Sequence, residues 1–144
     1  MFMGEYNHTI DSKGRFILPA KFREDMTEGM IITRGLDGCL YIYQKNEWKV
    51  FEEKLKKLPL TKKSSRQFVR FFMAGACECD VDKQGRVLIP VNLREYANID
   101  KDIVIVGVIN KIEIWNQQTW KESNEEYEDM DVIAEQMEEF DITL

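Results

Sequence analysis

The chain has 144 residues, 44% of them hydrophobic and 32% charged, and its formal net charge at pH 7 is −6. This is the composition of a globular domain, and no apolar run approaches the roughly 18 residues of a transmembrane helix, so a membrane protein is excluded. The opening Met-Phe-Met-Gly-Glu lacks the basic and apolar regions of a signal peptide, and we therefore expect a cytoplasmic protein.

The net charge conceals a separation of charge along the chain. Residues 122–144 hold ten acidic residues and no Lys or Arg, whereas residues 1–121 carry a net charge of +4. A basic body followed by an acidic tail leaves a nucleic-acid partner possible despite the negative total.

The most informative feature is an internal duplication. Residues 10–24 return 71 positions later as residues 81–95, with six of the fifteen positions identical and six more exchanging one apolar residue for another. Each unit spans about 45 residues, which is too few to bury a stable core alone, so the two copies must fold against each other. We expect a first unit at 4–47, a helical connection at 48–74, a second unit at 75–119 and an acidic C-terminal helix or tail at 120–144.

Within each copy the pattern predicts a hairpin, a helical turn and a second hairpin. Residues 4–10 alternate as a strand does, residues 11–14 have the Asp and Gly of a type I turn, and residues 15–18 resume a β-rich run, so the turn is interpreted as the tip of a β-hairpin. Pro19 then ends the strand and permits a helical turn. A strand pair follows at 30–33 and 40–43, with its counterpart at 103–106 and 111–115.

The connection and the tail both show helical spacing. Asn46 is positioned to cap a first helix, and a second helix is expected to begin near Thr61 or Ser64 and to end at Gly75. The apolar arc of the second helix is wider than one face needs, which fits either the core or contact with a neighbouring subunit. In the tail, helical spacing among the acids predicts an amphipathic helix on Met130, Ile133, Met137 and Phe140.

The repeated turn supplies the candidate nucleic-acid contacts. A two-stranded β-ribbon fits the major groove of DNA, where an arginine can bond bidentately to guanine. We assign base contact to the arginines, charge to the lysines, close approach of the backbone to the glycines, and orientation of the loop to the aspartates. An alternative is that Asp and Arg form an ion pair that holds the turn. The DNA-binding candidates are Lys13, Gly14, Arg15, Lys83, Gly85 and Arg86, and the loop-orienting residues are Asp11 and Asp82.

Two further repeated pairs, Arg23 with Glu24 and Arg94 with Glu95, follow the prolines. We interpret these arginines as packing or ion-pair residues with some phosphate contact.

Catalysis and metal binding are not indicated. The single His8 lies in a strand pattern, and no catalytic triad, carboxylate pair or phosphate-binding loop accompanies it. Cys77 and Cys79 could join His8 around a metal, but they occupy ordinary strand positions, and three cysteines fit a reducing compartment. We expect a non-enzyme with no metal, no cofactor and no small-molecule substrate.

Several stretches together resemble the MraZ family: the doubled Asp-x-x-Gly-Arg, the opening Met-Phe-Met-Gly-Glu-Tyr, the segment 33–37 and the segment 58–63. The resemblance covers essentially the whole chain. It implies an α+β fold, mainly β with added helices, in which two tandem AbrB-like units form one swapped-hairpin, double-psi-type β-barrel.

The resemblance also implies a function. Proteins of this family are bacterial transcriptional regulators of the division and cell-wall gene cluster that bind tandem promoter repeats in double-stranded DNA as ring-shaped homo-oligomers. A cytoplasmic, nucleoid-associated protein is then expected. The alternative from the residues alone is a non-catalytic oligomeric scaffold whose basic patches bind acidic protein or RNA.

Overall fold

The computed structural model describes residues 1–125 and 129–144, and none of the helices in those ranges is long and apolar enough to cross a membrane. The first copy contains β1 (Phe2–Thr9), β2 (Arg15–Ile17), α1 (Ala20–Arg23), β3 (Met30–Arg34), the 3₁₀ turn η1 (Leu36–Gly38) and β4 (Leu40–Gln44). The second copy repeats this order with β5 (Cys77–Cys79), β6 (Arg86–Leu88), α4 (Val91–Tyr96), β7 (Asp102–Ile109) and β8 (Ile112–Asn116). The remaining elements are α2 (Lys45–Lys56), α3 (Lys63–Gly75), α5 (Gln117–Glu125), α6 (Met130–Gln136) and the 3₁₀ turn η2 (Met137–Phe140).

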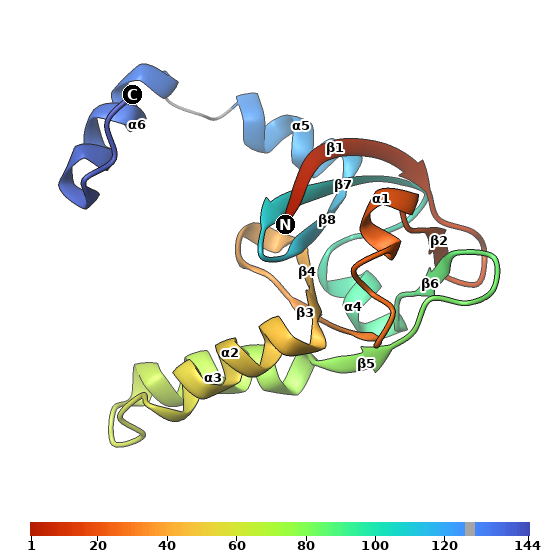
Figure 1. Ribbon diagram of the computed structural model, residues 1–144, viewed down its shortest axis with the longest axis horizontal. Coiled ribbons are helices and arrows are strands. Elements are labelled where there is room, and N and C mark those ends of the chain that lie inside the picture. The colour runs from red at the N-terminus through yellow and green to blue at the C-terminus, as the bar shows by residue number, and fades with distance from the viewer. Residues whose placement is uncertain (126–128) are drawn as a thin grey trace.

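The two copies exchange strands with each other. The strands form a six-stranded antiparallel sheet in the order β1-β7-β8-β4-β3-β5 and a separate two-stranded ribbon of β2 and β6. Strand β1 of the first copy therefore pairs with β7 of the second, and β5 of the second pairs with β3 of the first. Figure 1 shows β1 arching beside β7 above the β2–β6 ribbon.

The first β-hairpin predicted for each copy does not form, because the two strands that flank the turn do not pair with each other. The turn at 11–14 forms, but the strands on either side of it leave in different directions, β1 to β7 and β2 to β6. Side-chain alternation defines which face of a strand is buried and does not define which strand lies beside it. The second hairpin of each copy is confirmed, since β3 pairs with β4 and β7 with β8.

The α+β class is confirmed, but the described sheet is open and not a closed barrel. Strands β1 and β5 are its two edges, and the β2–β6 ribbon has no ladder to either of them among the described residues. Closure would need a further row of hydrogen bonds between these elements.

Both faces of the large sheet are covered. On one face Phe16 and Val87 of the ribbon pack with Ile32, Ile42 and Ile105 of the sheet in the main core. On the other face, aromatic residues of β4, α2 and α3 form a second buried cluster that includes Tyr41, Tyr43, Trp48 and Phe72. Successive residues of β3 and β4 alternate between these two clusters, and for this reason the two strands are almost entirely buried.

The helical connection forms an α2–α3 hairpin that extends from the body (Figure 1). The expected cap at Asn46 is wrong: helix α2 begins at Lys45, and its cap position is Gln44, which makes no side-chain capping bond. Helix α3 begins at Lys63, between the two predicted starts, and Gly75 is its last residue.

The predicted helix in the tail is confirmed for the described residues. Helix α6 begins after Asp129, whose carboxylate accepts a hydrogen bond from the amide of Asp131, and η2 continues it to Phe140. The apolar side chains of Met130 and Phe140 remain exposed.

Candidate nucleic-acid interface

The two Asp-Arg turns, residues 11–15 (first turn) and 82–86 (second turn), have the same internal geometry. In the first turn, Oδ1 of Asp11 accepts hydrogen bonds from the amides of Lys13 at 3.0 Å and Arg15 at 2.9 Å, while Oδ2 accepts from Arg15 Nε at 2.8 Å. In the second turn, Asp82 accepts from the amides of Gln84 and Arg86 and from Arg86 Nε at 2.9, 2.8 and 2.8 Å. One carboxylate thus fixes both the turn and the orientation of its arginine.

The bonds to each aspartate favour its ionised form. The amide of Arg15 contributes most to lowering the pKa of Asp11, and the Arg15 side chain and the Lys13 amide add to it. The same contacts from Arg86 and Gln84 lower the pKa of Asp82. A carboxylate that accepts three N–H groups is a stable acceptor at neutral pH.

Both arginines lie on the outer face of the β2–β6 ribbon. Phe16 and Val87 point into the core, so their neighbours Arg15, Ile17, Arg86 and Leu88 face outward. Arg15 pairs with Leu88 and Ile17 with Arg86, which makes the two arginines diagonal neighbours about 7–8 Å apart at Cα. The two turns themselves lie at opposite ends of the ribbon because the strands are antiparallel.

The terminal nitrogens of these arginines make no hydrogen bond to the described part of the chain. Only Nε of Arg15 and Arg86 is bonded to protein, and within residues 1–125 and 129–144 no group accepts from their Nη atoms. Each guanidinium is therefore anchored through Nε and keeps two adjacent donor groups available, as bidentate recognition of a guanine edge or a phosphate requires.

Gly14 and Gly85 close the two turns. Their φ angles are +86° and +80°, a region that favours glycine, and their amides donate to the main-chain carbonyls of Asp11 and Asp82. Both glycines are buried. Their amides are thus engaged within the turns, and close approach of a phosphate to these glycines stays a prediction.

Each glycine is covered by an arginine from the other copy. A Cβ on Gly14 would lie 2.6 Å from Cζ of Arg94, and a Cβ on Gly85 would lie 2.9 Å from Cζ of Arg23. Nε of Arg94 donates to the carbonyl of Ile89 at 2.9 Å, whereas Nε of Arg23 is buried with no partner among the described residues. The second repeated arginine of each copy thus packs on the turn of its partner copy.

Arg23 and Arg94 were expected to be packing or ion-pair residues, but the turns against which they pack were not predicted. The ion pairs suggested for them with Glu24 and Glu95 do not occur in the described part of the chain. The recurrence of these arginines 71 positions apart indicated that they have a structural role. Their contact with the turn of the other copy could not be predicted without knowing that the copies exchange strands.

The lysines lie at the tips of the turns. Lys13 and Lys83 are exposed and contribute positive charge beside Arg15 and Arg86. Their side chains make no ion pair within residues 1–125 and 129–144.

The metal site considered for His8, Cys77 and Cys79 does not form in the described residues. His8 lies on β1 and the cysteines on β5, and these strands are the opposite edges of the sheet. Burial also raises the pKa of the Cys79 thiol to about 12, so that it stays protonated at neutral pH.

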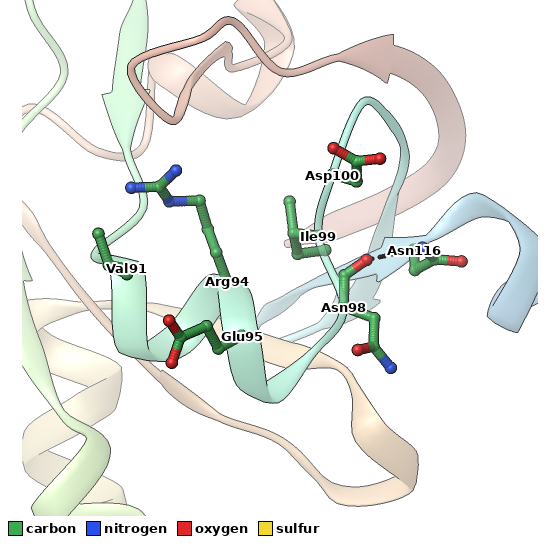
Figure 2. A pocket seen from close by; sticks show the side chains of 7 residues that line it. All are labelled: Val91, Arg94, Glu95, Asn98, Ile99, Asp100 and Asn116. Atoms are coloured by element: carbon green, nitrogen blue, oxygen red, sulfur yellow. Dashed lines mark hydrogen bonds between the residues drawn. The ribbon is translucent and has the colours of Figure 1, made fainter.

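A shallow depression of about 600 Å³ lies beside α4 and shares only Arg94 with the contacts around the turns. Figure 2 shows its side chains spread around the opening, with Arg94 and Glu95 pointing away from Asn98 and Asp100. The amide of Asn116 donates to the Asn98 carbonyl at 2.7 Å across the depression. The lining does not converge on a point where a substrate atom could react.

Comparison with known proteins agrees with the duplicated architecture. A family model described as "MraZ protein, putative antitoxin-like" matches the chain twice, at residues 1–71 and 72–142. The chain is 61% identical over 143 residues to the transcriptional regulator MraZ of Caldicellulosiruptor bescii, covering 99% of this chain and 100% of that one. The MraZ regulators of Clostridium tetani and Clostridium acetobutylicum are 59% and 58% identical over 142 residues, with the same coverage.

Fold and turns together define a class: a tandem α+β repeat protein whose copies exchange strands and each present one Asp-Arg turn. The chain belongs to the MraZ family.

Proposed function

We propose that this chain is a sequence-specific DNA-binding transcriptional regulator that uses the two Asp-Arg turns as its reading elements. The observation that carries the proposal is the placement of Arg15 and Arg86 on one ribbon face, each held by an aspartate through Nε and each with Nη atoms that no described protein group accepts from. The names of its relatives, which are called transcriptional regulators, support the same role.

The DNA contacts follow from this geometry. The ribbon enters the major groove, Arg15 and Arg86 bond to guanine, and Lys13 and Lys83 bind phosphate on either side. Ile17 and Leu88 lie on the same face, each directly opposite one of the arginines, where they contact thymine methyl groups. Asp11 and Asp82 do not contact DNA and hold the arginines in position.

Several finer parts of the proposal come from the family resemblance. The chain folds as a swapped-hairpin unit, assembles into a homo-oligomeric ring, binds tandem promoter repeats and regulates the division and cell-wall gene cluster. It acts in the cytoplasm, associated with the nucleoid, without catalysis, metal, cofactor or small-molecule substrate. Multiple turns in one assembly raise affinity for repeated sites through effective concentration.

A mobility-shift titration with the DNA upstream of the chain's own gene tests the proposal. Arg15→Ala and Arg86→Ala should each lose about 1–3 kcal/mol of preference for that DNA over a scrambled duplex. Arg15→Lys is the matched control, since it keeps the charge and loses the planar pair of donors. Lys13→Ala should weaken both duplexes alike. A folded Arg15→Ala/Arg86→Ala double variant that retains full preference would refute the reading face.

The alternative is an oligomeric scaffold for acidic protein or RNA. It is favoured by the α2–α3 hairpin, which carries nine Lys or Arg residues and three acidic ones between residues 45 and 75. If the scrambled duplex, an RNA and the upstream DNA bind equally well, this alternative replaces the regulator.

A further inference from the structure

The α2–α3 hairpin carries an apolar groove on its surface. The groove measures about 250 Å³ and is lined by Glu52, Leu55, Lys56, Leu60, Val69 and Met73. Leu55 forms its buried floor, while Leu60 and Met73 are 61% and 40% exposed. Apolar side chains of this size, gathered at one groove and left in water, mark a surface that another element covers.

The segment 129–144 has the complementary character. Helix α6 and the turn η2 carry Met130 and Phe140, which are 56% and 64% exposed, with Ile133 and Met137 between them. These four side chains recur at helical spacing and form a stripe about 15 Å long. The stripe is surrounded by six acidic residues and no Lys or Arg.

Groove and segment also match in charge. Residues 45–75 have a net charge of +6, and residues 129–144 have a net charge of −6. Lys56 lies on the groove itself, and its exposed ion pair with Glu53 at 3.0 Å is too weak to prevent it from pairing with another carboxylate. The lining itself balances Lys56 with Glu52, so it is the net positive charge of the hairpin around the groove that favours a partner with an apolar stripe between acids.

The two surfaces do not meet within one chain. Figure 1 shows α6 and the α2–α3 hairpin as separate projections from the body, and Leu60 and Met73 of the hairpin and Met130 and Phe140 of the segment are exposed. We propose that residues 129–144 of one chain dock, by the Met130–Ile133–Met137–Phe140 stripe, into the α2–α3 groove of a second chain of the same protein. The inference rests on the proposed homo-oligomer and does not depend on DNA binding.

Such a contact is directional. Each chain has one groove and one acidic segment. The two surfaces in contact are therefore different, and the contact is heterologous. Repetition of a heterologous contact gives a ring when its rotation closes and an open chain when it does not.

Two full-length variants and their mixture test the contact by light scattering without DNA. Met73→Asp places a carboxylate in the groove, and Met137→Asp interrupts the stripe. Each variant should show a smaller mass than the unmodified chain. The mixture should form a 1:1 dimer, because the intact segment of the Met73→Asp chain can still enter the intact groove of the Met137→Asp chain.

Ala74→Asp and Gln136→Asp are the matched controls, since each adds the same acid one residue away at an exposed position. Both should keep the mass of the unmodified chain. Unchanged mass for Met73→Asp and Met137→Asp would overturn the proposal, as would a mixture that forms no dimer. The second outcome would mean that the segment docks within its own chain or on another surface. Circular dichroism of every variant separates loss of assembly from loss of folding.

Discussion

A single carboxylate organises each Asp-Arg turn. Asp11 and Asp82 accept the same three kinds of N–H donor at 2.8–3.0 Å, although one turn contains Ser12 and Lys13 where the other has Lys83 and Gln84. The residues that differ contribute backbone amides, which every residue at those positions supplies. This explains why only Asp, Gly and Arg are identical between the two turns.

The turns should give stability a characteristic dependence on pH. The folded pKa of Asp11 and of Asp82 lies below the ordinary value. The stabilisation is therefore complete above the unfolded pKa, about 3.9, and is lost as pH falls through the lower folded pKa. Urea unfolding should find Asp11→Asn less stable than the unmodified chain at pH 7, with the difference narrowing towards pH 2. A difference that is constant over this range would contradict the assignment of an ionised acceptor.

Gly14 should tolerate alanine less well than another glycine of similar φ. Gly14 and Gly38 have φ of +86° and +79°, so alanine costs about 1–2 kcal/mol of backbone strain at either position. At Gly38 the new Cβ would have no atom within 4 Å, whereas at Gly14 it would displace Arg94. Urea unfolding should show a larger loss for Gly14→Ala than for Gly38→Ala.

The same comparison in an Arg94→Ala background provides the control. Without the Arg94 guanidinium, the losses for Gly14→Ala and Gly38→Ala should converge. Equal losses in the unmodified background would mean that the arginine does not rest on the turn.

At the residue scale, the sequence revealed the turn but not its surroundings. Identity of Asp, Gly and Arg in both copies was enough to predict the turn and its arginine. The contact of Arg94 with Gly14 joins residues 80 positions apart through strand exchange, and no local pattern encodes it. The DNA contacts of Arg15 and Arg86 stay predictions.

At the scale of elements, the α2–α3 hairpin is attached to the sheet through the end of α3. Thr33 is fully buried, and its hydroxyl donates to the Phe72 carbonyl at 2.7 Å. Arg34 donates from Nε and Nη2 to the Phe71 carbonyl at 2.9 and 2.7 Å, and its guanidinium lies 4.8 Å from the Phe71 ring centre. The Phe72 carbonyl is one of the last four of the helix, which have no intrahelical partner, and Thr33 satisfies it, while Arg34 adds a second attachment one residue earlier.

Thr33→Val tests this attachment with almost no change of shape. It removes the donor and leaves the Phe72 carbonyl buried, which should cost about 1–3 kcal/mol of unfolding free energy. Hydrogen exchange should accelerate at the C-terminal turn of α3. Thr9→Val on the exposed side of β1 is the control and should change neither measurement. An unaltered urea midpoint for Thr33→Val would show that water or another donor replaces the hydroxyl.

Element boundaries were largely predictable, since apolar periodicity and the prolines at 19 and 90 mark them locally. Helix α2 shows the limit: Asn46 is a good capping residue by type, but the chain is already helical at Lys45. Packing of Trp48 and Phe51 on the sheet, and not a side-chain cap, determines where this helix lies.

At the scale of the whole molecule, the two copies cannot be separated. Four of the six strand ladders in the described residues join one copy to the other. Chains 1–75 and 76–144, prepared separately, should lack cooperative unfolding, and mixing them should restore it. Coincident transitions by circular dichroism and tryptophan fluorescence would check this in the intact chain. A cooperatively folded 1–75 fragment would contradict it.

The duplication predicted that the two copies share a core, but it did not predict the order in which their strands pair. A unit of about 45 residues requires a partner on energetic grounds, and this much was predictable. The open edges at β1 and β5 depend on strand order and twist, which are properties of the assembled sheet. No local residue pattern therefore supported the expectation of a closed β-barrel.

The pairing of β1 with β7 has a consequence for synthesis of the chain. The register joins Phe2 to Ile109 and Thr9 to Asp102, so the first strand made by the ribosome pairs with a segment about 100 residues later. At about 5–20 residues per second, the nascent N-terminus waits roughly 5–20 s for its partner. During that interval Phe2 and Ile10, both buried in the finished protein, are available to other nascent chains and to chaperones. The ladder that holds the beginning of the chain therefore cannot form until β7 has been synthesised.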